Sequence, residues 1–244
     1  MFLTSFVRRE YKYLINRSKY ETILPYIQTF ARPDDYCTSS DGYFVANIYY
    51  DTPGNNIIRH SVSDPYFKEK LRMRFYSQPK SIDDPVFVEM KKKLNGIVSK
   101  RRITLPLGEA ESFLTGVMPK PRDDYLFNQI SKELMQFILV NDVRPSVRID
   151  YKRIAFFSCD NPDVRITFDY DITSCRDDPS PVRESGGIPL ISDDEMLMEI
   201  KFSNSVPIGL ARLLSEAHIY RNGYSKYGNE YKRFVSGSNE RYGL

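Results

Sequence analysis

The sequence contains few of the residues on which common catalytic and metal sites depend. It has no tryptophan, and its only histidines are His60 and His218. The three cysteines, Cys37, Cys159 and Cys175, lie far apart and form no CxxC pair. This scarcity argues against histidine-based chemistry, a zinc site and a disulfide framework. A reducing compartment is therefore expected.

Long apolar runs and familiar catalytic motifs are also missing. No apolar run approaches the roughly 20 residues that a membrane-spanning helix needs, and the segment 1–9 is too short and polar for a signal peptide. The sequence contains no GxxxxGK[ST] loop, GxGxxG, HExxH or GxSxG motif. We therefore expect a cytoplasmic protein with no transmembrane segment, and the sequence identifies no membrane-protein partner.

The overall composition is that of a soluble globular protein. The 244 residues are 41% hydrophobic and 27% charged, and they are expected to form a single domain over residues 1–244. The net charge of +3 is too small for a nucleic-acid coat, so no nucleic-acid partner is expected. Local clusters of charge are therefore more informative than the total.

Several segments alternate cations with apolar residues. In the segment 69–76, Lys70, Arg72 and Arg74 share one face of a strand, while the residues between them are apolar. The alternation recurs in the segments 88–91, 165–169 and 198–202. One such strand is typical of a half-solvated edge. Several in one chain predict a sheet closed around a charged lumen, which should bind a polyanion.

The same alternation predicts about eight strands, near 7–15, 43–50, 69–76, 86–93, 99–105, 146–157, 164–172 and 196–202. Amphipathic helices are predicted near 18–31, near 124–140, and from Ser205 and Pro207 onward; a capping box of Ser18 and Glu21 begins the first. The predicted fold class is α+β, a closed antiparallel β-barrel with a cationic lumen and helices packed outside. The polar segment 174–195 is predicted to be either a disordered loop or a lid.

The lumen face of these strands supplies the candidate site. Its cations and their neighbours are Arg8, Lys12, Lys70, Arg72, Arg74, Lys91, Lys93, Lys100, Arg102, Tyr151, Arg153, Arg165, Lys201, Ser225 and Lys226. Its carboxylates are Glu10, Glu89, Asp169 and Glu199, which are candidate ligands of Mg²⁺ or Mn²⁺. Arginine forks and lysine ammonium groups suit phosphate oxygens.

Each of these features has a plainer explanation when taken alone. A run such as 91–93 is typical of a solvated strand face, and the alternation leaves Lys92 and Arg101 outside the lumen. Tyr151 could belong to the core, and it cannot share a face with Arg148 and Asp150 unless a bulge intervenes. Repetition of the pattern over several strands favours the functional explanation.

The ordered set of motifs resembles the catalytic domain of the vacuolar transporter chaperone (VTC) family, the polyphosphate polymerases, within the triphosphate tunnel metalloenzyme (CYTH-like) superfamily. The resemblance covers nearly the whole chain. It rests on RREYKY at 8–13, YYDT at 49–52, KLRMR at 70–74, VEMK at 88–91, KRR at 100–102, YKR at 151–153, VRI at 164–166, MEIK at 198–201 and SKY at 225–227.

The resemblance implies a role for most of the candidate residues. Phosphates of the nucleotide and of the growing polyphosphate would be bound by Lys12, Arg72, Arg74, Lys91, Lys100, Arg153, Arg165, Lys201 and Lys226. Tyr151 and Ser225 would contact phosphate, and Glu199 would hold the metal ion. We take Lys12, Arg72, Arg74, Lys91 and Lys201 as the candidate catalytic set, with Lys70 and Arg102 as further phosphate-binding residues. Glu10, Glu89 and Asp169 are further metal candidates.

The resemblance also sets the expected reaction. Superfamily hydrolases and cyclases carry glutamates where this sequence has Arg8 and Lys201, so two carboxylates are replaced by cations. Fewer carboxylates should weaken a second metal site and favour retention of a phosphate chain as acceptor. We expect a metal-dependent polymerase acting on ATP and inorganic polyphosphate. A metal-dependent tripolyphosphatase or nucleoside triphosphatase, and a non-catalytic polyphosphate-binding module, are the alternatives.

Overall fold

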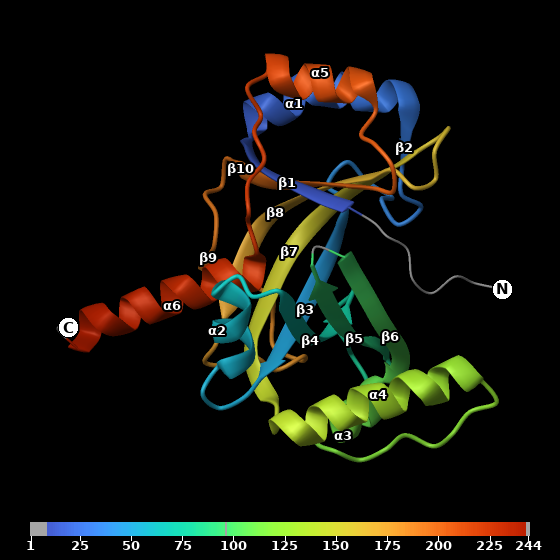
Figure 1. Cartoon of the computed structure of the whole chain (residues 1–244), viewed down its shortest axis with the longest axis vertical. Helices are drawn as coiled ribbons and strands as arrows, with labels where there is room; N and C mark the ends of the chain where they lie inside the picture. The colour runs from blue at the N-terminus through green and yellow to red at the C-terminus, as the bar shows by residue number, and fades with distance from the viewer. Residues whose placement is uncertain (1–8, 96, 243–244) are drawn as a thin grey trace.

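One large antiparallel sheet dominates the fold (Figure 1). The computed structural model describes residues 9–95 and 97–242. The long strands are hydrogen-bonded in the order β1 (Arg9–Asn16), β10 (Glu195–Phe202), β8 (Arg165–Cys175), β7 (Arg144–Ser158), β3 (Tyr43–Asp51), β4 (Phe67–Phe75), β5 (Pro85–Leu94) and β6 (Ile97–Pro106). All eight predicted strands are confirmed. Arg8 lies outside the described residues.

Two short strands extend the sheet and were not predicted. β2 (Ala31–Pro33) pairs with the end of β7, and β9 (Ile188–Pro189) pairs with β8. With two and three residues, neither is long enough to show the alternation on which the sequence prediction depends. Both pairings are antiparallel, as in the rest of the sheet.

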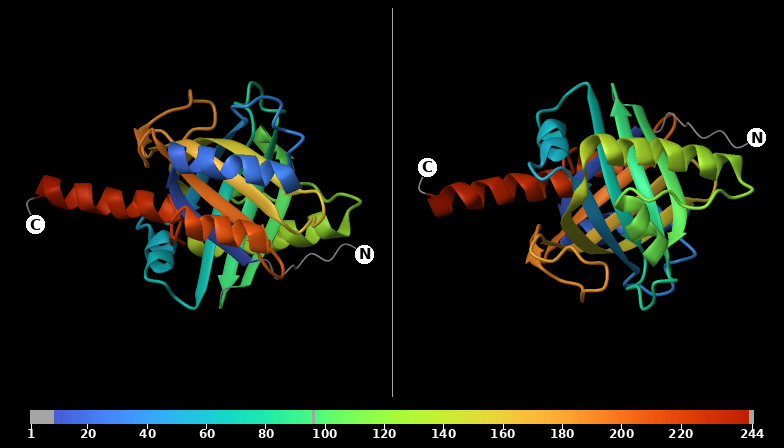
Figure 2. Two further views of the ribbon diagram at one scale, coloured as in Figure 1. Left: turned by 90° about the horizontal axis from the view of Figure 1, so that it is seen from above. Right: turned by 90° about the horizontal axis from the view of Figure 1, so that it is seen from below.

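The predicted closure of the barrel is not observed. The sheet curls around a central space (Figure 2), but β1 and β6 are its two edges, and no backbone ladder joins them within the described ranges. Instead, Lys91 Nζ of β5 lies 3.4 Å from Glu10 Oε2 of β1, so side chains bridge the gap. Closure depends on strand tilt and stagger, which alternation alone does not specify.

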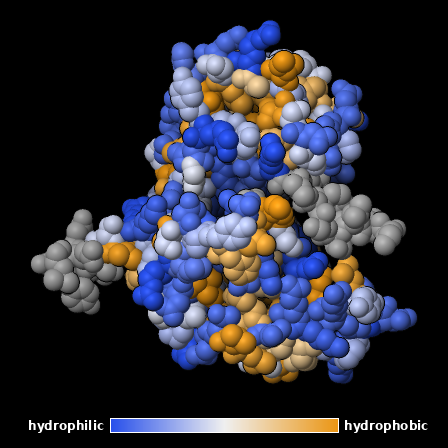
Figure 3. All heavy atoms as spheres, viewed as in Figure 1, coloured by the Kyte–Doolittle hydropathy of each residue, from blue (hydrophilic) through white to orange (hydrophobic). Residues whose placement is uncertain are grey.

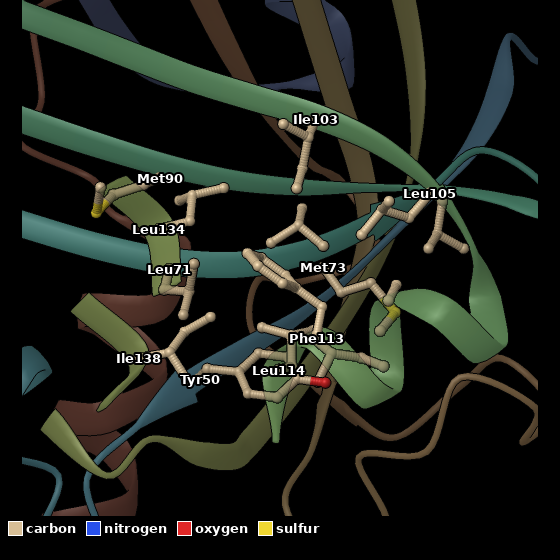
Figure 4. Close-up of a cluster of buried hydrophobic side chains, with 14 of the residues drawn as sticks. Tyr50, Leu71, Met73, Met90, Ile103, Leu105, Phe113, Leu114, Leu134 and Ile138 are labelled. Atoms are coloured by element: carbon tan, nitrogen blue, oxygen red, sulfur yellow. The ribbon is translucent and has the colours of Figure 1, made fainter. Parts of the chain in front are cut away.

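Four helices pack against the outer, apolar face of the sheet, where helices were predicted. α3 (Leu107–Leu114) and α4 (Tyr125–Asn141) cover β3 to β6, where Leu71 and Met73 are fully buried against Phe113 and Leu134 (Figure 4). α1 (Arg17–Phe30) and α5 (Ile208–Glu216) cover β1, β8 and β10 at the opposite end of the molecule (Figures 1 and 2). The cations between these apolar residues are thereby directed to the inner face, which also carries a buried cluster that includes Val147, Ile149 and Tyr227.

The start of the first helix differs from the prediction. The side chain of Asn16 accepts a hydrogen bond from Lys19 N at 3.0 Å and is the N-cap. The predicted capping box of Ser18 and Glu21 is therefore wrong. Asn16 is also the last residue of β1, so the strand passes directly into the helix with no loop between them.

Three helices were not predicted: α3, described above, and two that are tied to Asp51 at the end of β3. α2 (Asn56–Val62) places its backbone N–H groups of Ile57 and Ile58 at 2.9 Å from the Asp51 carboxylate. α6 (Lys226–Tyr242) donates from the Tyr227 hydroxyl to the same carboxylate at 2.8 Å. Asp51 thereby fixes the beginning of α6 inside the sheet, from where the helix runs outward (Figure 1).

The segment 174–195 is not the unstructured loop that its composition predicts. β8 extends to Cys175, and β9 pairs with it. The fully buried guanidinium of Arg148 donates hydrogen bonds to the backbone carbonyls of Ser180 and Arg183, both at 2.9 Å. Asp150 accepts from the same guanidinium at 2.8 Å. This network lies on the outer side of β7 and holds the segment against the sheet.

The molecular surface is mostly hydrophilic in the view of Figure 3. Hydrophobic surface gathers over the C-terminal end of α4, where Leu139 and Val140 are exposed. No helix within residues 9–95 and 97–242 is long and apolar enough to cross a membrane.

Candidate functional site

The curled sheet encloses a cavity of about 600 Å³, which we call the lumen. β1, β3, β4, β5, β7 and β10 contribute to its wall, together with the residues around the start of α6. Three carboxylates line it, those of Glu10, Asp64 and Glu199. Twelve cations line it: Lys12, Lys68, Lys70, Arg72, Arg74, Lys91, Lys93, Arg153, Lys201, Arg221, Lys226 and Lys232. This excess of positive charge is the main chemical property of the site.

Three cations on β4 form one row along the lumen. Arg74 donates to Asn47 Oδ1 at 2.8 Å and to the Tyr151 hydroxyl at 3.1 Å. Lys70 donates to Ser225 Oγ at 3.0 Å, which joins β4 to the residue before α6. The row follows from the alternation in β4, because Leu71 and Met73 are held in the outer core. The neighbours hold the row in place.

Glu89 on β5 is the anchor of the row. Only 1% of its surface is exposed, and its Oε2 accepts from Arg72 Nε and Nη2 at 2.9 and 2.7 Å. Its other oxygen contacts Arg102 and, at 2.7 Å, Lys100 Nζ. Burial opposes ionisation, but these cations hold the pKa of Glu89 well below its usual value. Glu89 is therefore a counter-ion to three cations.

Asp169 on β8 has the corresponding position on the other wall. Its two oxygens accept from Arg153 Nε and Nη2 at 2.6 and 2.7 Å, a bidentate pair. Lys226 at the start of α6 donates to the same carboxylate and lies 3.8 Å from Glu199. Burial raises the pKa of Asp169, but Arg153 and Lys226 lower it by a larger amount, so the pKa lies below its usual value. This carboxylate is fully occupied by protein cations.

Glu10 and Glu199 lie side by side with lysine between them. Lys12 Nζ is 3.3 Å from an oxygen of each, and Lys201 Nζ is 3.6 Å from Glu199 and 3.8 Å from Glu10. Burial and Glu199 raise the pKa of Glu10, but Lys91, Lys12 and Lys201 lower it to about 2. Burial lowers the pKa of Lys12, but the two glutamates raise it above its usual value. Lys12 and its lysine neighbours likewise hold the pKa of Glu199 well below its usual value against burial, so Glu10, Glu199 and Lys12 are all charged at neutral pH.

Two lysines of the lumen have lowered pKa values. Burial, followed by repulsion from Lys12 and Lys91, lowers the pKa of Lys70 to about 7. Burial lowers the pKa of Lys201 to about 8, although Glu199 and Glu10 oppose the shift. Both groups would gain charge stabilisation from a bound anion. The charge distribution of the lumen therefore favours an anionic ligand.

The carboxylates fit a metal ion only in part. No group of three or more His, Cys, Asp or Glu residues in the described part of the chain could hold a metal by itself. Glu89 and Asp169 are each occupied by protein cations. Glu10 and Glu199 also contact lysines, but unlike Glu89 and Asp169 they line the lumen, as two neighbouring carboxylates. Mg²⁺ and Mn²⁺ accept such a set when substrate phosphates complete the oxygen ligands.

Among the predicted phosphate-binding and catalytic residues, all but three line the cavity. Lys100 and Arg102 do not line the cavity, because both reach Glu89 from the edge strand β6. Arg165 does not line it either; its Nη2 donates to Asp34 at 2.8 Å and to Tyr43 at 3.3 Å. All the other predicted phosphate-binding and catalytic residues line the lumen: Lys12, Lys70, Arg72, Arg74, Lys91, Tyr151, Arg153, Lys201, Ser225 and Lys226.

The position of Tyr151 is settled by simple alternation along β7. Tyr151 and Arg153 line the lumen, while Arg148 and Asp150 hold the segment 174–195 on the outer side. Lys92 and Arg101 also lie outside, as predicted, and both pair with Glu133 of α4 at 3.0 and 3.1 Å.

Sequence reasoning missed several polar residues in or behind the wall of the lumen. Asn47 aligns Arg74, and the ring of Tyr49 stacks on Tyr227 with centroids 4.5 Å apart. The hydroxyl of Thr167 is buried beside Glu199 in the strand register and has no hydrogen-bond partner among the described residues. A signal was present for Asn47 and Tyr49, which alternate on β3. No signal marked Thr167, because threonine is common in strands.

Together, the fold and the lumen define a class of protein, in which a curled antiparallel sheet presents a cationic interior to an anionic ligand. The chain belongs to the VTC domain family, whose model matches residues 7–235. The match spans all of the strands and the cavity-lining residues named above. No protein in a search of curated proteins matches the chain.

Three solved structures match the chain at low sequence identity. A putative adenylate cyclase from Bacillus halodurans matches with a TM-score of 0.53 and 12% identity, over 91% of this chain and 96% of that one. A putative adenylate cyclase from Vibrio parahaemolyticus matches with a TM-score of 0.49 and 15% identity, over 95% and 99%. The Mimivirus capping enzyme triphosphatase has a TM-score of 0.36 and 12% identity, over 87% and 89%. At such identities the first of these supports the fold alone.

Proposed function

We propose that this protein is a metal-dependent polyphosphate polymerase that transfers the γ-phosphoryl group of ATP to the end of an inorganic polyphosphate chain in the lumen. The observation that carries the proposal is the charge of the lumen, with twelve cations against three carboxylates. A phosphate chain carries about one negative charge per phosphate, so it matches an extended cationic surface better than a compact anion does. Membership in the VTC domain family supports the same function.

The reaction requires one bond to form and one to break. A terminal oxygen of the polyphosphate chain attacks the γ-phosphorus of ATP, and the bond from that phosphorus to the β–γ bridging oxygen breaks. The electron pair stays on that oxygen, ADP leaves, and the chain is longer by one phosphate. The attacking oxygen is largely ionised at neutral pH, so no general base is needed. The scarcity of histidine is compatible with such a reaction.

The protein contributes position and charge. Arg72 and Arg74 are held by Glu89 and Asn47, so their remaining donors are oriented before substrate binds. Lys12, Lys91 and Lys201 surround Glu10 and would stabilise charge that develops on the transferred group. Phosphoryl transfer depends mainly on such positioning and neutralisation.

Mg²⁺ or Mn²⁺ is the proposed cofactor, held by Glu199 with Glu10 as a second carboxylate. When bound, such an ion supplies positive charge to the phosphate oxygens. The carboxylates of Glu89 and Asp169 keep their structural cations in this proposal. Glu89 and Asp169 are therefore not proposed as metal ligands.

Transferase is favoured over hydrolase by the surroundings of Lys201. Its ammonium group lies within 4 Å of both Glu199 and Glu10, at 3.6 and 3.8 Å. A cation at this position competes with a second metal ion, which could otherwise activate a water molecule. It also adds to the charge that retains an acceptor chain. The hydrolase and the binding module remain as outcomes of the test.

The test is to incubate the purified protein with ATP and Mg²⁺ or Mn²⁺ and to separate polymer, ADP and free phosphate. The proposal expects polymer together with ADP. Free phosphate without polymer would instead identify a hydrolase. Binding without turnover, even with a short polyphosphate primer present, would identify a binding module.

Matched variants connect the activity to the lumen. Arg72→Ala and Lys201→Ala should each reduce synthesis by at least about 100-fold, because each removes a positive charge that stabilises the transition state. Arg101→Ala is the control, since Arg101 lies on the outer side and pairs with Glu133. Wild-type synthesis in either lumen variant would contradict the proposal.

A further inference from the structure

The two ends of the lumen face carry different side chains. Along β4 and just beyond it, this face presents Lys68, Lys70, Arg72, Arg74 and Tyr76 in that order. The cavity reaches Lys68 at one end, whereas Tyr76 at the other end is not part of its lining. The face therefore changes from purely cationic to aromatic over a single strand. A ligand that is anionic at one end and flat at the other would match this order.

Four aromatic side chains form a continuous series at the second end, which we call the aromatic cluster. They are Tyr36, Tyr43, Tyr76 and Phe87. Successive ring centroids are 6.2, 6.0 and 5.6 Å apart, all in edge-to-face contact. The residues come from the loop after β2 and from β3, the end of β4 and β5, so the sheet assembles the cluster from distant parts of the sequence.

Two residues of the aromatic cluster are exposed, unlike the aromatic residues of the cavity, while Tyr43 and Phe87 are half-buried. Tyr36 is 74% exposed and Tyr76 is 36% exposed. Tyr49 and Tyr151, which line the cavity, are buried. A cluster that served only to fill the core would be buried as these two are. Its exposure next to a cationic row indicates a surface that accepts a ligand.

Two arginines border the aromatic cluster. Arg102 donates to the Tyr76 hydroxyl at 3.2 Å, and its guanidinium carbon lies 4.3 Å from the Phe87 ring centroid. Arg165 donates to the Tyr43 hydroxyl at 3.3 Å, and its buried Nε has no hydrogen-bond partner among the described residues. Both arginines therefore place positive charge beside the aromatic cluster, apart from the cavity.

We propose that the aromatic cluster binds the base of the nucleoside triphosphate, with the triphosphate directed along β4 toward Arg74 and Arg72. This inference rests on the proposed function, in which ATP is the donor. A strand rises about 3.3 Å per residue, so Tyr76 lies about 7 Å from Arg74 and about 13 Å from Arg72. The polarity of a nucleotide, base at one end and phosphates at the other, matches the polarity of the lumen face.

The proposal has a consequence for specificity. Aromatic rings stack on any base, because every base has a π-face. The cluster offers rings and arginines, so it should accept adenine and guanine with similar affinity. The preference of the site is then for a nucleoside triphosphate over inorganic tripolyphosphate.

The test compares two ligands that share the same three phosphates. An ATP analogue that cannot be cleaved between its β and γ phosphates and inorganic tripolyphosphate are titrated separately into the full chain by calorimetry. The variants are Tyr36→Ala and Tyr76→Ala. Tyr125→Ala is the matched control, because this tyrosine is 83% exposed at the start of α4 on the outside of the sheet.

The wild-type protein should bind the analogue about ten-fold more tightly than tripolyphosphate, and each cluster variant should lose about ten-fold for the analogue alone. Tyr76→Ala also removes a partner of Arg102, and the tripolyphosphate titration measures that effect separately. Tyr125→Ala should change neither affinity. An equal loss for both ligands, no loss in either variant, or equal wild-type affinities would overturn the proposal.

Failure of this inference is distinguishable from failure of the proposed function. A protein that makes polymer but binds the analogue and tripolyphosphate equally would lack the base site and still be a polymerase. A protein that prefers the analogue through Tyr36 and Tyr76 but makes no polymer would keep the base site and lose the polymerase assignment.

Discussion

Arg72 and Glu89 form a two-point contact on neighbouring strands, with Arg72 Nε and Nη2 at 2.9 and 2.7 Å from the same carboxylate oxygen. Glu89 also serves Lys100 and Arg102, so one buried negative charge supports three cations on β4 and β6. The pair therefore links the stability of the sheet to the orientation of the phosphate-binding row. Removing the charge should affect both.

Glu89→Gln should lower the free energy of unfolding by about 3 kcal/mol, because it leaves buried cations without a counter-charge. The measurement is urea unfolding followed by circular dichroism. Glu133→Gln is the control; Glu133 is a partly exposed partner of Lys92 and Arg101, so its loss should cost less than about 1 kcal/mol. Equal effects of the two substitutions would show that Glu89 is not the anchor.

Glu199→Gln should weaken the dependence of activity on the metal ion. The half-saturating concentration of Mg²⁺ or Mn²⁺ should rise by at least about ten-fold, since one of the two available carboxylate ligands is lost. The measurement is polymer synthesis as a function of metal concentration at fixed ATP. Glu133→Gln should leave the half-saturating concentration unchanged. A normal metal response in Glu199→Gln would remove this residue from the metal site.

Binding of tripolyphosphate should weaken as the pH rises from about 7 to 9. The pKa of Lys70 is lowered to about 7, first by burial, so this lysine loses its charge over the lower part of that range in the free protein. A bound phosphate favours the protonated form, so binding at pH 8 should take up protons. Calorimetry in buffers of different ionisation enthalpy measures the uptake. Lys70→Arg should reduce it.

The same group should have the opposite effect on stability. An unfolded lysine keeps its proton to about pH 10.4, whereas Lys70 in the fold releases it near 7. The unfolded state therefore binds more protons between these values, and the contribution of Lys70 to the free energy of unfolding rises with pH. As the pH rises from about 7 to 10, the free energy of unfolding of the wild type should therefore increase relative to that of Lys70→Arg. Parallel pH profiles would contradict the assignment.

Arg148→Lys should loosen the segment 174–195 without affecting the lumen. Lysine keeps a positive charge beside Asp150 but cannot donate in a fork to the carbonyls of Ser180 and Arg183. A loss of about 2 kcal/mol in stability and faster proteolysis within 176–187 are expected. The affinity for tripolyphosphate should stay at the wild-type value. A loss of that affinity would show that the segment acts on the site.

The eight long strands and the faces of their cations were predictable from the sequence, because a period of two is visible over segments such as 69–76. The helices α2 and α3 were not, since with seven and eight residues each is too short to show helical periodicity. The start of α6 was not predictable either, since it depends on Asp51, a residue far from α6 in the sequence. α6 also begins with Lys226, whose partner is Asp169 on β8. Such starts are set by tertiary contacts and leave no local pattern.

The site residues that follow strand alternation were predictable from the sequence. Those that come together only when distant segments pack were missed. Tyr76 continues the row of Arg72 and Arg74, but the series with Tyr36 and Tyr43 appears only when β3 and β4 pair. The open edges of the sheet were also missed, because they too depend on how the strands assemble. Strand tilt and stagger decide closure, and neither leaves a signal in the residue order.

The most direct test of the account is to follow labelled phosphate from ATP into polymer. The protein is incubated with Mg²⁺ or Mn²⁺ and with ATP that carries the label on either the γ or the α phosphate, and the products are separated by size. The account predicts labelled polymer from the γ label only, with one ADP formed for each phosphate incorporated. Label from the γ position that appears solely as free phosphate would contradict it.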